Sequence, residues 1–134
     1  MKPELYTAAE YEAAWNDFHE TDIHDLIDTL RAAYPNLKIY CLPYGRGAVE
    51  LKKLWEAGEL PEIPYHTDFK EGVFRDLTGH AGKMLEALGG LMWLDGIYGV
   101  DLSTYDYETG YNADLKAMGT VLMAKPGHQD YDFE

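Results

Sequence analysis

One short segment near the N-terminus is rich in imidazole and carboxylate side chains. These groups are common ligands of protein-bound metal ions. They are His19, Glu20, Asp22, His24, Asp25 and Asp28. His24 and Asp28 are four residues apart, so a helix would place both on one face, which suits two metal ligands. A small metal-dependent hydrolase that uses residues 19–28 with His66 or His80 is therefore one interpretation. Because the zinc-protease pattern HExxH is absent, we favour a solvated acidic helix face, with no metal and no other cofactor.

Other catalytic motifs are incomplete. Residues 78–83 end in Gly-Lys like a phosphate-binding loop, but Leu77 and Met84 occupy positions where that loop requires Gly and Ser or Thr. Ser103, the only serine, lacks the surroundings of a hydrolase nucleophile. Cys41, the only cysteine, lies in an apolar run, which predicts a buried and inert thiol. We therefore expect a protein that is not an enzyme.

The negative charge is unevenly distributed along the chain. The sequence has 134 residues and a formal net charge of −13. Residues 1–30 contain eight acids and one base, residues 95–134 contain eight acids and two bases, and the segment between them contains eight of each. Such a chain lacks the cationic side chains that displace counterions from nucleic acid or dock on anionic lipid. If the two acidic ends meet in the fold, they form one anionic surface suited to a basic protein.

Tyrosines alternate with acidic residues in the C-terminal third. Tyrosine supplies a large contact area at low entropic cost, and carboxylates beside aromatic rings can take the place of phosphates and bases. An ordinary half-exposed strand is the alternative interpretation, because tyrosine favours β-structure. The predicted partner-binding residues combine this segment with the acidic side of the second helix. They are Asp22, Asp25, Asp28, Tyr105, Asp106, Tyr107, Glu108 and Tyr111.

Helices are predicted in the first two thirds of the chain. Thr7 and Glu10 fit a capping box, and apolar residues follow at helical spacing. A second helix is predicted over residues 22–34, with Asp22 as its cap and Pro35 beyond its end. Further helices are predicted over residues 48–57, 68–77 and 79–88. The predicted core residues are Trp15, Ile27, Leu30, Ile39 and Leu54.

The C-terminal third is expected to be β-structure. Asp95-Gly96 between two apolar runs predicts a hairpin turn, because both turn residues need positive φ, and Gly89-Gly90 predicts the end of the preceding helix. The expected strands cover residues 91–94 and 97–102, with residues 105–107 as an extension of the second strand or as a third strand, and the sheet also includes residues 37–42. Residues 112–125 are compatible with a helix, through Leu115, Met118 and Leu122, or with a strand over residues 119–124, and we favour the strand. The predicted fold class is α+β, with N-terminal helices packed on a small antiparallel sheet formed mainly by the C-terminal third. One acidic domain spans residues 1–134, with a tail that frays from about residue 127.

The small size, the segregated acidic charge and the acid–tyrosine segment resemble the composition of small acidic inhibitors from phages and mobile elements, among them anti-CRISPR and anti-restriction proteins. This resemblance implies a non-enzymatic inhibitor that occupies a basic, nucleic-acid-binding surface of a partner protein. It implies no direct contact with nucleic acid or membrane. A phage structural or assembly protein is a further alternative. Without a signal sequence or a long apolar run, we expect a cytoplasmic protein, in the host cytoplasm if a phage encodes it.

Overall fold

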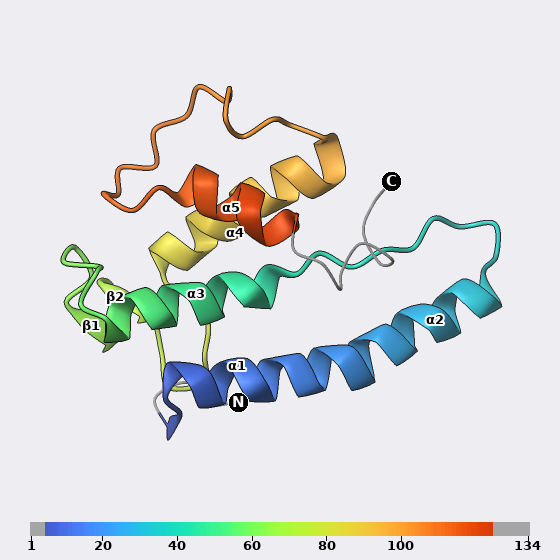
Figure 1. Ribbon diagram of the computed structural model, residues 1–134, viewed down its shortest axis with the longest axis horizontal. Coiled ribbons are helices and arrows are strands. Elements are labelled where there is room, and N and C mark those ends of the chain that lie inside the picture. Colours follow the sequence, from blue (N-terminus) through green and yellow to red (C-terminus); the bar gives the residue numbers. More distant parts are fainter. Residues whose placement is uncertain (1–4, 125–134) are drawn as a thin grey trace.

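One long helical arm opens the chain and runs along one side of the molecule (Figure 1). The computed structural model describes residues 5–124. The arm consists of α1 (Ala8–Phe18), the π-helical turn η2 (His19–Ile23) and α2 (His24–Ala33), and we call residues 8–33 the acidic arm. The elements that follow it are α3 (Tyr44–Glu56), β1 (Tyr65–Thr67), β2 (Gly72–Phe74), α4 (Lys83–Tyr98) and α5 (Leu115–Met123).

Local sequence signals set both ends of the acidic arm. The Thr7 hydroxyl accepts a hydrogen bond from the Glu10 amide, and the Thr7 amide donates to the Glu10 carboxylate at 2.9 Å, which confirms the capping box. Tyr34, before Pro35, ends α2 as predicted. Asp22 does not cap a separate helix. The backbone stays helical through η2, where the wider π-turn absorbs an extra residue within one continuous helix.

A two-stranded sheet lies at the other end of the molecule from α2 (Figure 1). Its strands are parallel, with Tyr65 opposite Gly72 and Thr67 opposite Phe74. The fold is therefore mixed α+β, but the sheet is parallel and comes from the middle of the sequence. The prediction of an antiparallel sheet from the C-terminal third is wrong.

The predicted helix over residues 68–77 is wrong for a local reason. The Asp68 side chain accepts hydrogen bonds from the backbone amides of Lys70 and Glu71, both at 2.9 Å, and so closes the turn that leads into β2. An Asp side chain makes such bonds in a turn as readily as at a helix start. A capping-box pattern without a following amphipathic run therefore does not distinguish a turn from a helix.

The core is built around α4, which packs against α5 and α3. Its buried residues are Met84, Leu85, Leu88, Gly89, Leu91 and Met92. The neighbouring elements contribute further buried side chains, which are Leu51, Val73, Phe74, Leu102, Leu115 and Leu122. Because its apolar side chains face neighbours on several sides, α4 lacks the single apolar stripe of a surface helix.

The predicted hairpin at Asp95-Gly96 is wrong. α4 starts at Lys83, continues through these residues and ends at Gly99, whose φ is 62° and whose amide donates to the Asp95 carbonyl at 2.8 Å. Gly96 serves packing instead, because a Cβ atom there would lie 2.2 Å from Cδ2 of Leu42. Gly96→Val is therefore expected to be destabilising through overpacking and not through turn conformation.

The remaining predicted strands are also wrong. Residues 119–124 belong to α5 and its C-terminal cap, residues 105–107 lie in a loop, and residues 37–42 form an extended connection. Short apolar runs are typical of buried helices as well as buried strands, so periodicity does not separate the two. The predicted fraying from residue 127 lies outside the described residues.

The predicted core is right in part. Trp15 and Ile27 are buried, whereas Leu30, Ile39 and Leu54 are half-buried. The reason is the position of α2, whose main contacts among the described elements are with η2, while α1 packs on α3. An amphipathic pattern predicts which face of α2 is apolar, but not how completely other elements cover that face.

Candidate functional site

The outer half of the acidic arm carries exposed carboxylates. Asp22 in η2 and Asp25 and Asp28 in α2 are all exposed, as are Asp17 and Glu20 before them. Within residues 5–124, neither Asp22 nor Asp25 forms an ion pair with a cationic side chain. Carboxylates held on one helix in this way produce a concentrated negative potential.

The two halves of the acidic arm differ in how their charge is balanced. In α1, Glu12 accepts a hydrogen bond from Nζ of Lys53 at 2.8 Å, so α3 pairs one carboxylate in this half of the arm. In α2, the Nε atom of Arg31 donates to the Ile39 carbonyl at 2.8 Å. The exposed carboxylates of Asp22 and Asp25, which form no ion pair among the described residues, therefore lie beside the exposed apolar side chains of Phe18 and Leu26.

The predicted acid–tyrosine residues lie in the loop between α4 and α5 and not in a strand. The ring centroids of Tyr105 and Tyr107 are 6.0 Å apart, and Nζ of Lys116 donates to the Tyr105 carbonyl at 3.1 Å. Asp106 and Glu108 are exposed. This loop presents carboxylates and aromatic rings together, although Lys116 balances part of the charge.

Tyr111 is held more tightly than the other residues of this loop. The Glu62 carboxylate accepts hydrogen bonds from the amides of Asn112 and Ala113, at 3.0 and 3.3 Å, and so fixes the backbone that follows Tyr111. Burial raises the pKa of the Tyr111 hydroxyl, and Tyr107 and nearby carboxylates raise it further. Tyr111 is therefore a neutral, half-buried anchor of a hollow of about 260 Å³ that Tyr107 and Glu108 also line.

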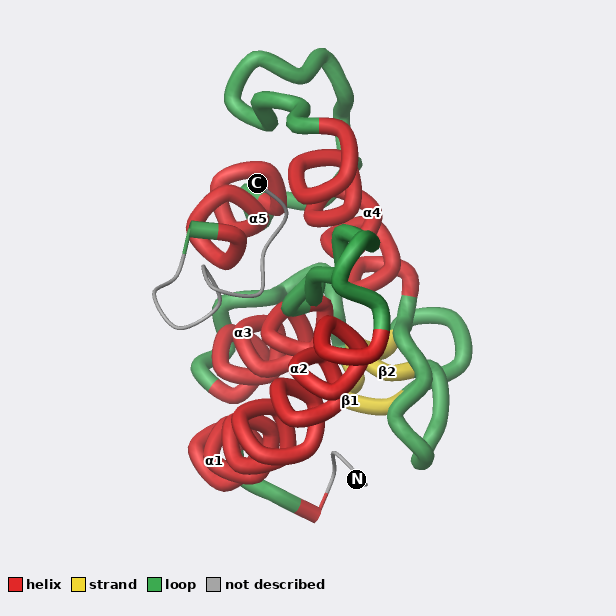
Figure 2. The backbone as a smooth tube through the Cα atoms, turned by 90° about the vertical axis from the view of Figure 1, so that its right-hand side faces the viewer, coloured by secondary structure: helices red, strands yellow, loops and turns green. Residues whose placement is uncertain are grey.

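The structure does not bring the two acidic segments together. α2 and the loop over residues 99–114 lie on opposite sides of α3 and α4, which separate them in both views (Figure 1 and Figure 2). Asp22, Asp25 and Asp28 form one surface, and residues 105–111 form another. Any partner that contacts both surfaces must reach around the helical body.

The histidines of the proposed metal cluster are likewise separated. His19 and His24 are neighbours in the acidic arm, with ring centroids 5.0 Å apart, whereas His66 lies in β1 and contacts Nζ of Lys52 at 3.3 Å. His80 pairs with Asp76. No group of three or more His, Cys, Asp or Glu side chains within residues 5–124 is arranged to hold a metal ion.

No family model, curated protein or solved structure matches the chain. In the part of the chain that the structure describes, none of the helices combines the length and hydropathy that a membrane crossing requires.

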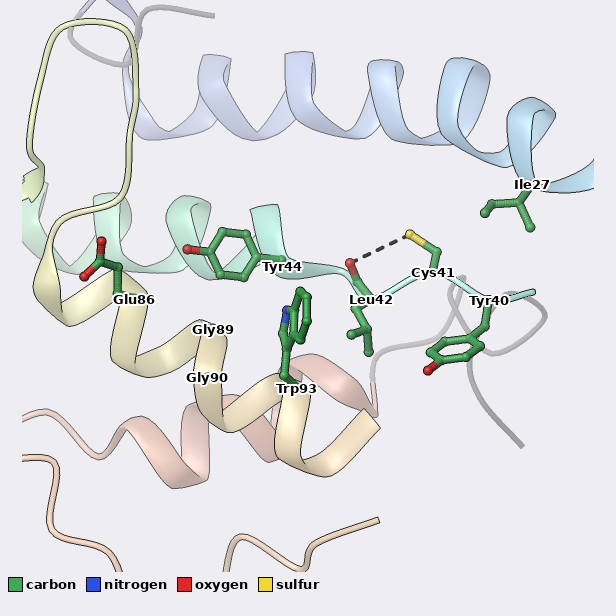
Figure 3. Close-up of a pocket in the computed structure, with 9 residues that line it drawn as sticks. All are labelled: Ile27, Tyr40, Cys41, Leu42, Tyr44, Glu86, Gly89, Gly90 and Trp93. Carbon is green, nitrogen blue, oxygen red and sulfur yellow. Dashed lines mark hydrogen bonds between the residues drawn. The ribbon is translucent and has the colours of Figure 1, made fainter. Parts of the chain in front are cut away.

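Sequence patterns missed a cavity of about 840 Å³ between the acidic arm and α4 (Figure 3). We call it the α2–α4 groove. Ile27 lines the groove on the side of the acidic arm, and Leu42, from the connection between α2 and α3, also lines the groove. Trp93 and Gly90 of α4 form the opposite wall. The one local signal in this region is Gly89-Gly90, whose predicted helix end is wrong, since both glycines lie in the interior of α4.

Cys41 also lines the α2–α4 groove and is half-buried, not fully buried as predicted. Its Sγ atom lies 3.4 Å from Nε2 of the buried His19, which stacks on Trp15 with ring centroids 4.4 Å apart. Burial, together with the nearby His24 and Arg46, lowers the pKa of His19 to about 4. His19 is therefore neutral at pH 7 and supplies no positive charge to stabilise a Cys41 thiolate.

The adjacent glycines of α4 are expected to respond in opposite directions to alanine. A Cβ atom at Gly89 would lie 1.8 Å from Cε2 of Tyr44, so Gly89→Ala is expected to lower the free energy of unfolding by about 1–3 kcal/mol. A Cβ atom at Gly90 meets nothing within 4 Å, so Gly90→Ala is expected to raise it by up to about 1 kcal/mol. Denaturant unfolding of both variants measures the difference. Equal effects of the two variants would contradict the packing described for Tyr44.

Proposed function

We propose that this protein is an acidic, non-enzymatic interaction protein whose acidic arm binds the basic, nucleic-acid-binding surface of a partner protein and thereby inhibits that partner. The observation that supports the proposal is the outer half of the arm. Here Asp22 and Asp25 are exposed and form no ion pair among the described residues, and they lie on a helix that extends beyond its contacts with α3.

The spacing of these aspartates suits a row of cationic side chains. Asp22, Asp25 and Asp28 recur every third residue, so they advance by roughly 4.5 Å per step along a helix of 1.5 Å rise per residue. Lysine and arginine side chains that normally hold successive phosphates can pair with successive carboxylates in the same way. The net charge of −13 attracts such a surface before contact and raises the association rate.

Apolar side chains give the arm a means of close contact as well as attraction. Phe18 is 50% exposed and Leu26 is 51% exposed, and both lie among the acidic residues of the arm. Exposed ion pairs contribute little to affinity individually, whereas buried aromatic and aliphatic anchors contribute more. The arm therefore combines carboxylates for steering with apolar groups that a partner surface can bury.

The loop over residues 105–111 is a second candidate surface of the same kind. It supplies Tyr105, Tyr107 and Tyr111 as contact area and Asp106 and Glu108 as charge. Because it lies on the opposite side of α3 and α4 from α2, it is tested separately.

Matched charge reversals distinguish the surfaces. The partner is first captured from the native host, and its affinity for the wild-type chain is measured at low and high salt. We then compare three double variants, Asp22→Lys/Asp25→Lys, Asp106→Lys/Glu108→Lys and Glu59→Lys/Glu71→Lys, which change the net charge equally at exposed positions. The first is expected to weaken binding at least about tenfold, because each lysine repels the basic partner, and mainly through slower association. The Glu59/Glu71 variant is the control and is expected to bind almost like wild type.

Competition with nucleic acid tests the inhibitory part of the proposal. A nucleic acid that the partner binds is expected to displace this chain, because both occupy the same basic surface. Binding that is insensitive to salt, or three double variants with equal affinity, would contradict the electrostatic mechanism. Simultaneous binding of nucleic acid and this chain would contradict the inhibition.

A further inference from the structure

The α2–α4 groove has the size and lining of a small-molecule site. Its volume of about 840 Å³ lies within the range of roughly 300–1,000 Å³ that is typical of ligand pockets. Ile27, Leu42 and Trp93 supply an apolar lining, and Trp93 is 52% exposed, so its ring is accessible to a ligand. Polar groups are few: the Glu86 carboxylate and the Tyr44 hydroxyl lie at one end of the groove, and the Tyr40 hydroxyl and the Cys41 thiol lie at the other.

Gly90 keeps this groove open. Glycine in a helix interior is less favourable than alanine by about 1 kcal/mol, so a helical glycine calls for a structural or functional reason. Gly89 has such a reason in the ring of Tyr44, but a Cβ atom at Gly90 would meet nothing within 4 Å, and Gly90 has no positive φ. Because Gly90 has no side chain, the space beside it in the groove stays unfilled.

One end of the groove is anionic. Glu86 lines it, and the hydroxyl group of Tyr44 points toward Glu86 (Figure 3). The negative charge of Glu86 contributes to a raised pKa of Tyr44, second to burial, which agrees with their proximity. Nη1 of Arg75 is 3.9 Å from the Glu86 carboxylate, and because both side chains are about half exposed this pair contributes little. The Glu86 carboxylate is therefore accessible to a ligand.

The Glu86 carboxylate and the aromatic rings of the groove favour a cationic ligand. A carboxylate covered by an apolar ligand loses hydration without compensation, whereas a cationic head group replaces that hydration. The rings of Tyr44 and Trp93 also attract cations through their faces. A second copy of this chain is disfavoured as the occupant, since each copy carries a net charge of −13.

We propose that the α2–α4 groove binds small amphipathic organic cations, with the apolar body between Ile27, Leu42 and Trp93 and the cationic head near Glu86 and Tyr44. This site is separate from the exposed aspartates of the acidic arm. It does not depend on the proposed inhibitory function.

Calorimetric titration with octyltrimethylammonium, below its micelle-forming concentration, tests the proposal. Saturable binding of one molecule per chain is expected, with octanoate at least about tenfold weaker because its carboxylate meets Glu86. Tetramethylammonium, which has the head group without the apolar body, is expected to show no saturable binding. Equal affinity for octanoate and octyltrimethylammonium would overturn the proposal.

Two variants place the site in the groove. Gly90→Leu fills it and is expected to weaken octyltrimethylammonium binding at least about tenfold, whereas Ala13→Leu adds the same side chain at an exposed position of α1 and is expected to have no effect. Glu86→Gln is expected to weaken cation binding roughly threefold and to leave 1-octanol binding unchanged. Trp93→Ala, at an exposed position, provides a second disruption of the groove if Gly90→Leu does not fold. Wild-type affinity in the folded groove variants, or equal losses in Ala13→Leu, would overturn the proposal.

Discussion

Leu88→Ala is expected to lower the free energy of unfolding by about 2–5 kcal/mol. Leu88 is fully buried in α4 and fills the space between three helices, where its Cδ atoms lie close to the backbone of Gly47 in α3 and of Gly119 in α5. Truncation removes apolar contacts with both neighbouring helices. It also leaves a cavity, because the packed helices can move only partly into the space that the side chain occupied. Urea unfolding, monitored by circular dichroism, measures the change.

Leu30→Ala is the matched comparison, because it is the same substitution in a helix that is less covered. Leu30 is half-buried in α2, so we expect a loss of no more than about 1.5 kcal/mol. If both variants lose stability equally, then α2 is packed in solution as tightly as α4. That result would contradict the exposed position of the acidic arm on which its proposed function depends.

The features that the sequence predicted correctly depend on local interactions. The Thr7–Glu10 capping box needs only neighbouring residues. Pro35 ends the helix at Tyr34 because the proline ring clashes with the backbone of the preceding residue in the helical conformation. The exposure of Asp22, Asp25 and Asp28 was predictable for the same reason, since the apolar face of their helix is visible as a periodic pattern.

The features that the sequence did not predict depend on distant contacts. Asp95-Gly96 lies in a helix whose Gly96 packs beside Leu42 and Met123, and neither contact is visible from neighbouring residues. α4 is apolar on several faces, so it lacks the 3.6-residue period that distinguishes a helix from a strand. In the same way, segregated charge did not predict whether α2 and the loop over residues 99–114 meet, because that is decided by how α3 and α4 lie between them.

The α2–α4 groove could not be predicted for a related reason. Its walls come from residues as far apart in the sequence as Ile27 and Trp93, and the connection over residues 37–42 places Leu42 between them. The one local signal was the pair Gly89-Gly90. A pair of glycines indicates a missing side chain, but the sequence does not say whether a neighbouring ring or an open cavity takes that space.

The stability of the protein is expected to fall as the pH is lowered from about 7 to about 4, because of His19. The pKa of His19 is about 4 in the folded protein, where burial disfavours its charged form, and that of an unfolded histidine is about 6.5. Between these values the unfolded chain binds a proton that the folded protein does not. Protonation therefore favours unfolding, and the contribution approaches about 3 kcal/mol near pH 4.

His19→Gln separates this contribution from that of the carboxylates, which also titrate in acid. The variant loses the stacking on Trp15 and the contact with Cys41, so it is expected to be less stable than wild type at pH 7.5. Its stability is nevertheless expected to fall less steeply between pH 7 and pH 4, because no buried imidazole has to be protonated. Urea unfolding of both proteins across this range measures the two slopes. Parallel slopes would show that His19 is accessible to water in solution, and hence that η2 and the connection carrying Cys41 do not pack as described.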